Sequence, residues 1–221
     1  SQSFGIGQFG KIFKFLSENK CKKVLFAGKI NKPNFSSLKV DFKGFYYLPR
    51  IIKAAKIGDA AIIKAIIKIL IKEKIKVISS NTYNPELTVS RGCHTKLKPN
   101  TKDLISINKG IKSLEAINPN NHVQGLVVRD SIVVGKEKTH GTKKMLQMID
   151  KVKYPQGILI KFPKKNQDLR VDLPTIGFDT LKDCKKFGIK GIVLKSKQNI
   201  FIEKNKSIKF ANKNMIFIIV K

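Results

Sequence analysis

Lys11-Ile-Phe-Lys-Phe-Leu-Ser-Glu-Asn19 and, shortly after it, Val24-Leu-Phe-Ala-Gly28 decide the fold class of this chain. The apolar residues of the first segment recur at helical spacing, which predicts an amphipathic helix. The second segment is a short apolar run that ends in glycine, as is typical of a buried strand. A helix followed closely by a strand is the pattern of α/β proteins, so we expect an α/β fold.

Apolar spacing and cap residues continue this alternation along the chain. Leu48-Pro49 predicts a helix start, because proline suits the first helical turn, and Gly58-Asp59 is expected to separate this helix from the next. Helical spacing predicts further helices at residues 60–73, 101–117, 141–152 and 180–187. Apolar runs predict strands at 75–78, 126–128, 132–134, 157–161, 191–194, 199–203 and 215–220. The second and third strands should form a β-hairpin, and the last two should complete the main sheet.

The length of 221 residues allows two modest domains, each with its own core. Between residues 81 and 100 the periodicity fades, and Asn, Pro, Thr, Ser and Gly accumulate, as in a connection between domains. We therefore predict an N-terminal domain over residues 1–90 and a C-terminal domain over residues 91–221.

The formal net charge of +30 raises the question of a nucleic-acid partner. Lys, Ile and Asn are all abundant, which indicates a composition bias with lysines spread over solvated faces. Arginine, the residue that reads guanine with two hydrogen bonds, occurs only at Arg50, Arg91, Arg129 and Arg170. We therefore expect no nucleic acid as the main partner, while affinity for anionic substrates or membrane surfaces remains compatible with the charge.

The cysteines and the most apolar stretch indicate a cytoplasmic protein. Cys21, Cys93 and Cys184 are odd in number and widely separated, which favours neither a disulfide framework nor a zinc site. The stretch 60–78 is interrupted by lysines and cannot span a bilayer. Within it, residues 60–73 form a basic amphipathic helix, which fits an anionic membrane surface or, equally, a core helix with a solvated lysine edge.

The segment 161–177 is the first candidate for chemistry, because prolines and a glycine fix its turns and charged residues of both signs gather in it. A phosphoanhydride needs cations for its oxygens, and the attacking water needs a carboxylate as base or as a metal ligand. The segment offers both kinds: Lys161, Lys164, Arg170, Asp168 and Asp172. A purely structural salt-bridged turn would have the same composition.

A second candidate lies around Gln124-Gly125, Glu137 and His140-Gly-Thr142. Gly141-Thr142 before a helix would present backbone amides to an anion, although an ordinary helix cap explains the same pattern. The chain has no nucleophile elbow and no Walker sequence. Gly5-Ile-Gly-Gln-Phe-Gly10 has the letters of a dinucleotide-binding loop, but no strand precedes it.

Several motifs, in order along the chain, resemble the LpxI-type UDP-2,3-diacylglucosamine pyrophosphatases. The most specific of them is Arg170-Val-Asp-Leu-Pro-Thr-Ile-Gly177. The others are Gly5-Ile-Gly-Gln-Phe-Gly-Lys-Ile-Phe13, Phe26-Ala-Gly28, Lys32-Pro33, Leu48-Pro49, Gly58-Asp59, Arg91-Gly92, Gln124-Gly125 and Gly141-Thr142.

The resemblance implies a partial Rossmann-like N-terminal domain and a family-specific α/β C-terminal domain, with the lipid-nucleotide held between them. The implied reaction is magnesium-dependent hydrolysis of UDP-2,3-diacylglucosamine to UMP and 2,3-diacylglucosamine 1-phosphate in lipid A biosynthesis. It would take place in the cytoplasm, with peripheral contact to the inner membrane. The oligomeric state stays open, with a homodimer as one option.

The resemblance also implies roles for individual residues. Asp172 falls on the family's essential aspartate, as metal ligand or water activator, and Glu137 is a second carboxylate for the metal. Cations and donors that would arrange the diphosphate are Lys161, Lys164, Gln167 and Arg170. Further substrate-binding positions are Gly28, Gln124, Gly141, Thr142 and Thr175.

Two departures from the family pattern bear on activity. The family's opening strand and glycine-rich loop, about one βαβ unit, would lie upstream of Ser1, so we expect the natural protein to start earlier. Where the family usually has Glu-Gly-Thr-Asp, this chain has His140-Gly-Thr-Lys143, with Glu137 as a compensating carboxylate. Two alternatives therefore stay open: a non-catalytic relative that binds lipid-nucleotides or other anions, and a basic nucleic-acid-binding module.

Overall fold

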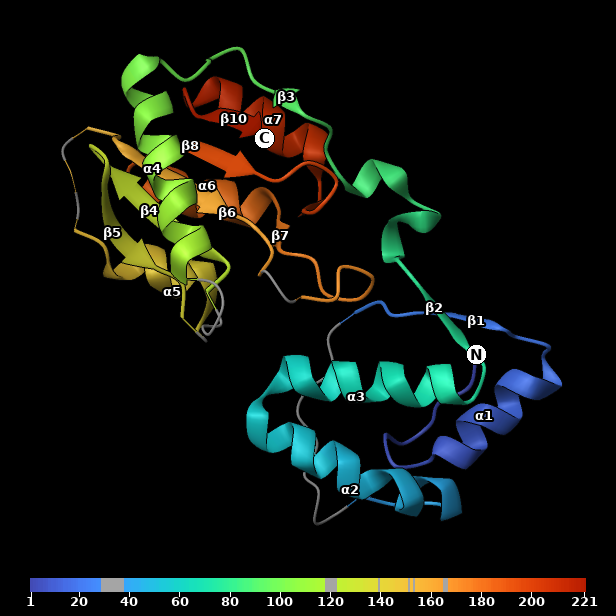
Figure 1. Cartoon of the computed structure of the whole chain (residues 1–221). Coiled ribbons are helices and arrows are strands. Elements are labelled where there is room, and N and C mark those ends of the chain that lie inside the picture. The colour runs from blue at the N-terminus through green and yellow to red at the C-terminus, as the bar shows by residue number, and fades with distance from the viewer. Residues whose placement is uncertain (29–37, 118–122, 139, 151, 153, 165–166) are drawn as a thin grey trace. The chain divides into compact units, whose positions relative to one another are not determined.

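A computed structural model describes residues 1–28, 38–117, 123–138, 140–150, 152, 154–164 and 167–221, without the side chains of residues 59 and 60. The chain forms two compact units, Ser1–Tyr83 and Asn84–Lys221 (Figure 1). The predicted domains were 1–90 and 91–221. Each unit is described by itself below.

Unit 1 combines three helices with a short parallel pair of strands in its described residues. The strands pair in register, with Val24 opposite Val77. The core combines aliphatic side chains with one aromatic cluster, in which Phe9, Phe13 and Tyr47 pack edge to face or tilted. The elements are α1 (Phe9–Glu18), β1 (Lys23–Leu25), α2 (Phe42–Ile57), α3 (Asp59–Lys72), β2 (Lys76–Ile78) and the 3-10 turn η2 (Ser80–Thr82).

Asp41 ties the starts of α1 and α2 together. Its carboxylate accepts hydrogen bonds from the backbone N–H groups of Gly10 at 3.0 Å, Lys11 at 2.9 Å and Gly44 at 2.7 Å. Burial alone would raise the pKa of Asp41, but these backbone donors outweigh it and lower the pKa. The first turn of α1 therefore already holds an anion, which is the protein's own carboxylate.

The predicted helix start at Leu48-Pro49 was wrong, because α2 begins at Phe42 and Pro49 lies inside it. Asp41 caps the helix by accepting a hydrogen bond from the Gly44 N–H. This cap, and not the proline, decides where the helix begins. Pro49 lies on the exposed side of the helix. The predicted break between α2 and α3 is confirmed at Gly58, whose φ of +140° favours glycine.

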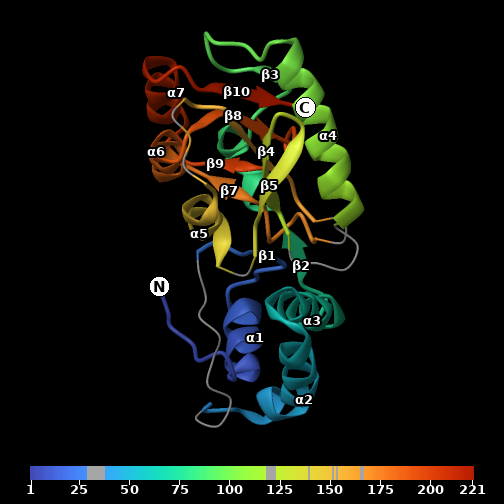
Figure 2. The same cartoon turned by 90° about the vertical axis from the view of Figure 1, so that its left-hand side faces the viewer.

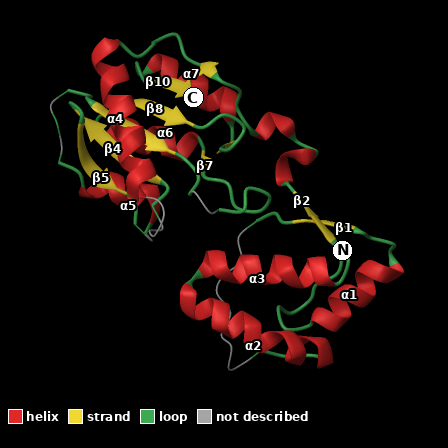
Figure 3. Cartoon of the chain, in the orientation of Figure 1, coloured by secondary structure: helices red, strands yellow, loops and turns green. Residues whose placement is uncertain are grey.

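Unit 2 is built on a six-stranded mixed sheet of order β3-β10-β8-β6-β4-β5 (Figure 3). Strands β6, β8 and β10 run parallel, while β3, β4 and β5 are antiparallel to their neighbours. The strands are β3 (Gly92–Cys93), β4 (Gly125–Arg129), β5 (Ile132–Lys136), β6 (Gly157–Lys161), β7 (Thr175–Ile176), β8 (Ile189–Leu194), β9 (Ile200–Phe201) and β10 (Phe217–Val220). The helices are α4 (Thr101–Ile117), α5 (Gly141–Met148), α6 (Phe178–Lys186) and α7 (Lys204–Lys213), after the 3-10 turn η3 (Pro85–Leu87).

The six-stranded sheet is the middle of three layers, with α4 on one face and α5, α6 and α7 on the other (Figure 2). Successive residues of a strand enter the two cores in turn, as Ile158, Leu159 and Ile160 do on β6. Gly110 lets α4 approach closely, since a side chain there would lie 2.4 Å from the Ile160 side chain. The α/β prediction is confirmed.

Three element predictions in unit 2 need correction. Residues 199–203 do not join the main sheet, because β9 covers two residues and pairs with β7 in a separate parallel ribbon. The helix predicted at 141–152 ends at Met148, where the backbone of Ile149 becomes extended. Helix α7 was not predicted, because its mostly polar sequence, Lys204–Lys213, has too few apolar residues to show helical spacing.

Candidate functional site

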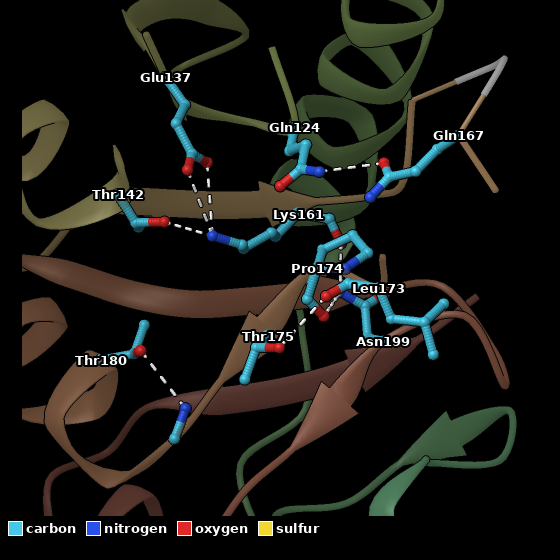
Figure 4. Close-up of polar contacts among 11 residues, drawn as sticks. Gln124, Glu137, Thr142, Lys161, Gln167, Leu173, Pro174, Thr175, Thr180 and Asn199 are labelled. Atoms are coloured by element: carbon cyan, nitrogen blue, oxygen red, sulfur yellow. Dashed lines mark hydrogen bonds and ion pairs between the residues drawn. The ribbon is translucent and has the colours of Figure 1, made fainter. Parts of the chain in front are cut away.

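The candidate site lies at the carboxyl end of β6, where α/β proteins usually bind their ligands. Asn199, which is fully buried, fixes both ends of the loop that follows β6. Its Nδ2 donates to the carbonyl oxygens of Lys161 at 3.0 Å and Pro174 at 3.4 Å, and its Oδ1 accepts from the Lys195 N–H at 2.8 Å (Figure 4). The two ends of this proline-containing loop therefore have a defined position relative to the sheet.

Lys161 is buried, and its ammonium group points at Glu137 and Thr142 (Figure 4). Nζ lies 3.4 Å from both carboxylate oxygens of Glu137 and donates to Thr142 Oγ1. Glu137 is 7% exposed and Lys161 6%, so water screens this ion pair little. Gly125 makes room for the pair, because a side chain there would lie 2.6 Å from Glu137 Oε2.

Gln167 connects three segments of the site. Its Oε1 accepts from Gln124 Nε2 at 3.0 Å and from the Lys164 N–H at 2.9 Å. Its Nε2 donates to the main-chain oxygen of Asp172 at 2.6 Å. The two predicted positions Gln124 and Gln167 therefore hold the loop against the residues just before β4.

The carboxylate of Asp172 is half-buried. Burial raises its pKa, while nearby Lys164 and a hydrogen bond from the Gln167 side chain act in the opposite direction. None of the ion pairs within the described ranges includes Asp172. A carboxylate with incomplete compensation for its burial is typical of functional sites.

Arg170 and Thr175 have local partners. Arg170 forms a two-pronged ion pair with Asp168, Nε–Oδ1 at 3.0 Å and Nη2–Oδ2 at 2.7 Å. This contact raises the pKa of the Arg170 guanidinium. Thr175 is exposed and donates to the Leu173 carbonyl at 3.2 Å.

The predicted site residues thus fall into three groups. The structure brings Gln124, Glu137, Gly141, Thr142, Lys161, Lys164, Gln167 and Asp172 to one end of the sheet of unit 2. Arg170 and Thr175 lie on the same loop. Gly28 lies in unit 1, at the end of β1, with a φ of +91°.

The comparison with known protein families covers nearly all of the chain. The model of the LpxI N-terminal domain matches residues 1–87, and that of the LpxI C-terminal domain matches residues 90–219. The chain belongs to the LpxI family. A relative is the UDP-2,3-diacylglucosamine pyrophosphatase LpxI of Caulobacter vibrioides, which is 32% identical over 223 residues, covering 97% of this chain and 80% of the relative.

The residues of this LpxI family member fit a magnesium ion at Asp172 better than at Glu137. In the part of the chain that the structure describes, no three His, Cys, Asp or Glu side chains gather as a metal site. Magnesium is commonly held by one or two carboxylates together with substrate phosphates and water, so one free carboxylate is sufficient. Both oxygens of Glu137 face the ammonium group of Lys161, whereas Asp172 has no cation in direct contact among the described residues.

An apolar cavity of about 350 Å³ lies between β5 and α5. Its apolar lining includes Val134, Met145 and Met148, and lysines line it as well. Lys136, Lys138 and Gly141 also line it, and they are the sequence neighbours of Glu137 and Thr142. The cavity is therefore adjacent to the polar cluster around Lys161.

The role of Asn199 at this site was not predicted from the sequence, and Asp168 was left without a role of its own. Nothing in the sequence around Asn199 indicates that its amide would hold residues that precede it by 38 and 25 positions. Asp168 was proposed only as one member of a mixed-charge segment, although its spacing of two from Arg170 permits a local pair.

No helix among the described residues is both long and apolar enough to cross a membrane.

Proposed function

We propose that this LpxI family member hydrolyses the diphosphate of UDP-2,3-diacylglucosamine, giving UMP and 2,3-diacylglucosamine 1-phosphate, in lipid A biosynthesis. Water supplies the new oxygen on one phosphorus, the bridging P–O bond breaks, and the proton of the water leaves to a base. The observation that carries the proposal is the half-buried Asp172 carboxylate, free of ion pairs in the described chain and held by Gln167 within a cation-bearing loop.

Asp172 serves in this proposal as the carboxylate that activates the attacking water or holds magnesium. Burial raises the pKa of Asp172, which makes its carboxylate a stronger base than an exposed aspartate. Magnesium, when bound, would neutralise charge on the phosphate oxygens. Lys164 is the cation whose charge acts on Asp172, and it is placed to attract the diphosphate to this carboxylate.

The Lys161–Glu137 pair has a positioning role in the proposal. Lys161 donates to Thr142 at the start of α5, and it thereby fixes the helix end at which Thr142 offers its backbone amide, while the Gly141 N–H already donates to the Lys138 carbonyl. The amides at a helix N-terminus attract phosphate oxygens. Because Glu137 neutralises Lys161, the charge that remains for substrate comes from Lys164 and from this helix end.

The apolar cavity between β5 and α5 suits an acyl chain of the substrate. Burial of an acyl chain lowers the free energy of the complex in proportion to the apolar surface removed from water. The cavity offers such surface beside the polar cluster. Lysines also line the cavity, and in this proposal they contact the polar part of the lipid. A substrate with a polar head and acyl chains matches this combination.

Release of UMP from UDP-2,3-diacylglucosamine tests the proposal. The purified chain should release UMP in the presence of magnesium, and EDTA should abolish the release. Substrate binding measured by calorimetry on the same sample separates the alternatives. Binding without UMP release would identify a non-catalytic member of the family, and absence of both would contradict the proposed substrate.

A further inference from the structure

The outer face of α2 in unit 1 exposes an unusual number of large apolar side chains. Phe42 is 90% exposed, Phe45 72% and Tyr46 54%, and at the other end of the helix Ile57 is 71% exposed. An exposed apolar group on a folded protein marks an interaction surface when several such residues are contiguous. We call Phe42, Phe45, Tyr46, Lys53, Lys56 and Ile57 the α2 outer face.

These residues share one side of the helix because of their spacing. Phe42, Phe45, Tyr46, Lys53 and Lys56 follow one another at the intervals that a helix brings to a single face. The opposite side of α2 packs inward and is buried: Gly44, Tyr47, Ile51, Ala54 and Ala55. The outer face is therefore a second apolar surface of α2, separate from the side that packs into the core of unit 1.

The same helix has four basic residues and no acidic one. Arg50, Lys53 and Lys56 take part in no ion pair within the described parts of the chain. The aromatic residues occupy the N-terminal half of the outer face and the lysines its C-terminal half. The face therefore combines apolar bulk with uncompensated positive charge.

Tyr46 joins the aromatic and cationic parts of this surface. Lys72 Nζ lies 5.1 Å from the ring centre and 3.2 Å from the phenol oxygen, and Arg50 lies 5.9 Å from the ring centre. These cations lower the pKa of the Tyr46 hydroxyl. Aromatic rings flanked by Lys and Arg are characteristic of the zone between lipid headgroups and acyl chains.

We infer that the α2 outer face docks unit 1 onto a lipid bilayer that contains anionic lipids. Phe42 and Phe45 insert among the acyl chains near the headgroups, and Arg50, Lys53 and Lys56 contact the anionic headgroups. The inference concerns attachment to the membrane and does not depend on hydrolysis. Single-stranded nucleic acid fits less well, because its binders stack bases along a basic groove, whereas this face is the outside of one helix.

The lysine edge of α3, which the sequence offered as a membrane surface, has fewer apolar groups exposed. Ile67, Ile69 and Leu70 are buried. Among the described side chains of α3, Ile71 is the only large apolar one that is exposed. Lys64 and Lys68 are exposed and add positive charge to unit 1. The structure thus shifts the expected membrane contact from α3 to the neighbouring helix α2.

Vesicle flotation of the full chain, without substrate, tests this inference. The chain should float with vesicles of phosphatidylcholine mixed with phosphatidylglycerol and much less with phosphatidylcholine alone. The double variant Phe42→Ser with Phe45→Ser should lower the partition coefficient at least about tenfold, because two exposed aromatic groups lose their apolar burial. The variant Lys53→Glu with Lys56→Glu should weaken binding to the mixed vesicles and leave the weak binding to neutral vesicles unchanged.

Matched controls carry the same changes on exposed positions of unit 2. Ile105→Ser with Ile132→Ser removes two exposed apolar groups, and Lys102→Glu with Lys109→Glu reverses two exposed charges on α4. Both should float like the unmodified chain, and so should Asp172→Asn, which separates membrane docking from hydrolysis. Equal flotation of the α2 and control variants would overturn the inference. Tight binding of single-stranded DNA that depends on Phe42 and Phe45 would overturn it in favour of nucleic acid.

Discussion

Gln167 donates a hydrogen bond from Nε2 to the main-chain oxygen of Asp172 over 2.6 Å. At its other end the same amide accepts from Gln124, on the segment before β4, and from the Lys164 N–H. Together with Asn199, which holds the two ends of the loop, this side chain therefore sets the distance between the loop that carries Asp172 and the sheet. The position of the proposed catalytic carboxylate depends on this contact.

Replacing Gln167 by Ala should lower kcat more than it changes KM. The substitution removes the hydrogen bonds that support the Asp172 loop, but it removes no charged group that binds the substrate. We therefore expect a loss of about tenfold to a hundredfold in kcat. Steady-state UMP release measures it. Gln147→Ala, an exposed position on α5, is the control and should leave kcat unchanged. A raised KM at constant kcat would instead show that Gln167 mainly binds substrate.

Asp172→Asn should stabilise the fold near neutral pH while removing activity. Burial raises the pKa of Asp172 above its ordinary value of 3.8, so the folded chain binds the proton more tightly than the unfolded chain does. This difference contributes to the free energy of unfolding fully below the ordinary pKa, and the contribution is lost as pH rises through the raised pKa of the folded chain. The introduced asparagine side chain does not titrate, so the variant does not lose stability in this way. Urea unfolding at acidic and neutral pH should show a gain in stability that appears only toward neutral pH.

The buried Lys161–Glu137 pair gives a prediction about stability. Lys161→Met alone leaves a buried carboxylate, and Glu137→Gln alone leaves a buried ammonium group, so each should cost about 3–5 kcal/mol in the free energy of unfolding. The double variant should recover most of that loss, because neither charge remains unpaired. A double-mutant cycle by urea unfolding measures the coupling. Additive losses would show that the two groups do not depend on each other.

The cavity between β5 and α5 makes a prediction about the acyl chains. Met148 lines the cavity and is 69% exposed, so Met148→Asp should fold normally and place a charge where an acyl chain would lie. We expect KM for the diacylated substrate to rise at least about tenfold. Met215→Asp, at an equally exposed position outside the cavity, is the control. An unchanged KM in Met148→Asp would place the acyl chains elsewhere.

The elements that the sequence predicted well are those with strong apolar periodicity. Helix α4 covers the predicted residues 101–117, and strand β6 the predicted residues 157–161. The hairpin of β4 and β5 turns at Asp130 and Ser131, which both have positive φ. Helix α4 and strands β4 and β6 bury apolar side chains, and that burial leaves a readable pattern in the sequence.

The features that the sequence could not show depend on contacts between distant residues. Asp41 caps α2 locally, but its bonds to Gly10 and Lys11 span 31 and 30 positions. Helix α7 forms because Ala211 and its neighbours pack on the sheet, although the segment is mostly polar. At the site, the charged loop was predicted from its composition, while the pairing of Lys161 with buried Glu137 forms only when the sheet places β4 between β6 and β5, so that the two side chains meet beside Gly125.

The most direct measurement for the central claim compares UMP release by the unmodified chain, Asp172→Asn and Asp179→Asn under identical conditions with magnesium. Asp179 is an exposed aspartate at the start of α6, paired with Lys182. The account predicts that Asp172→Asn loses at least about a thousandfold in kcat/KM with its fold intact, and that Asp179→Asn retains full activity. UMP release by Asp172→Asn at the unmodified rate would contradict it.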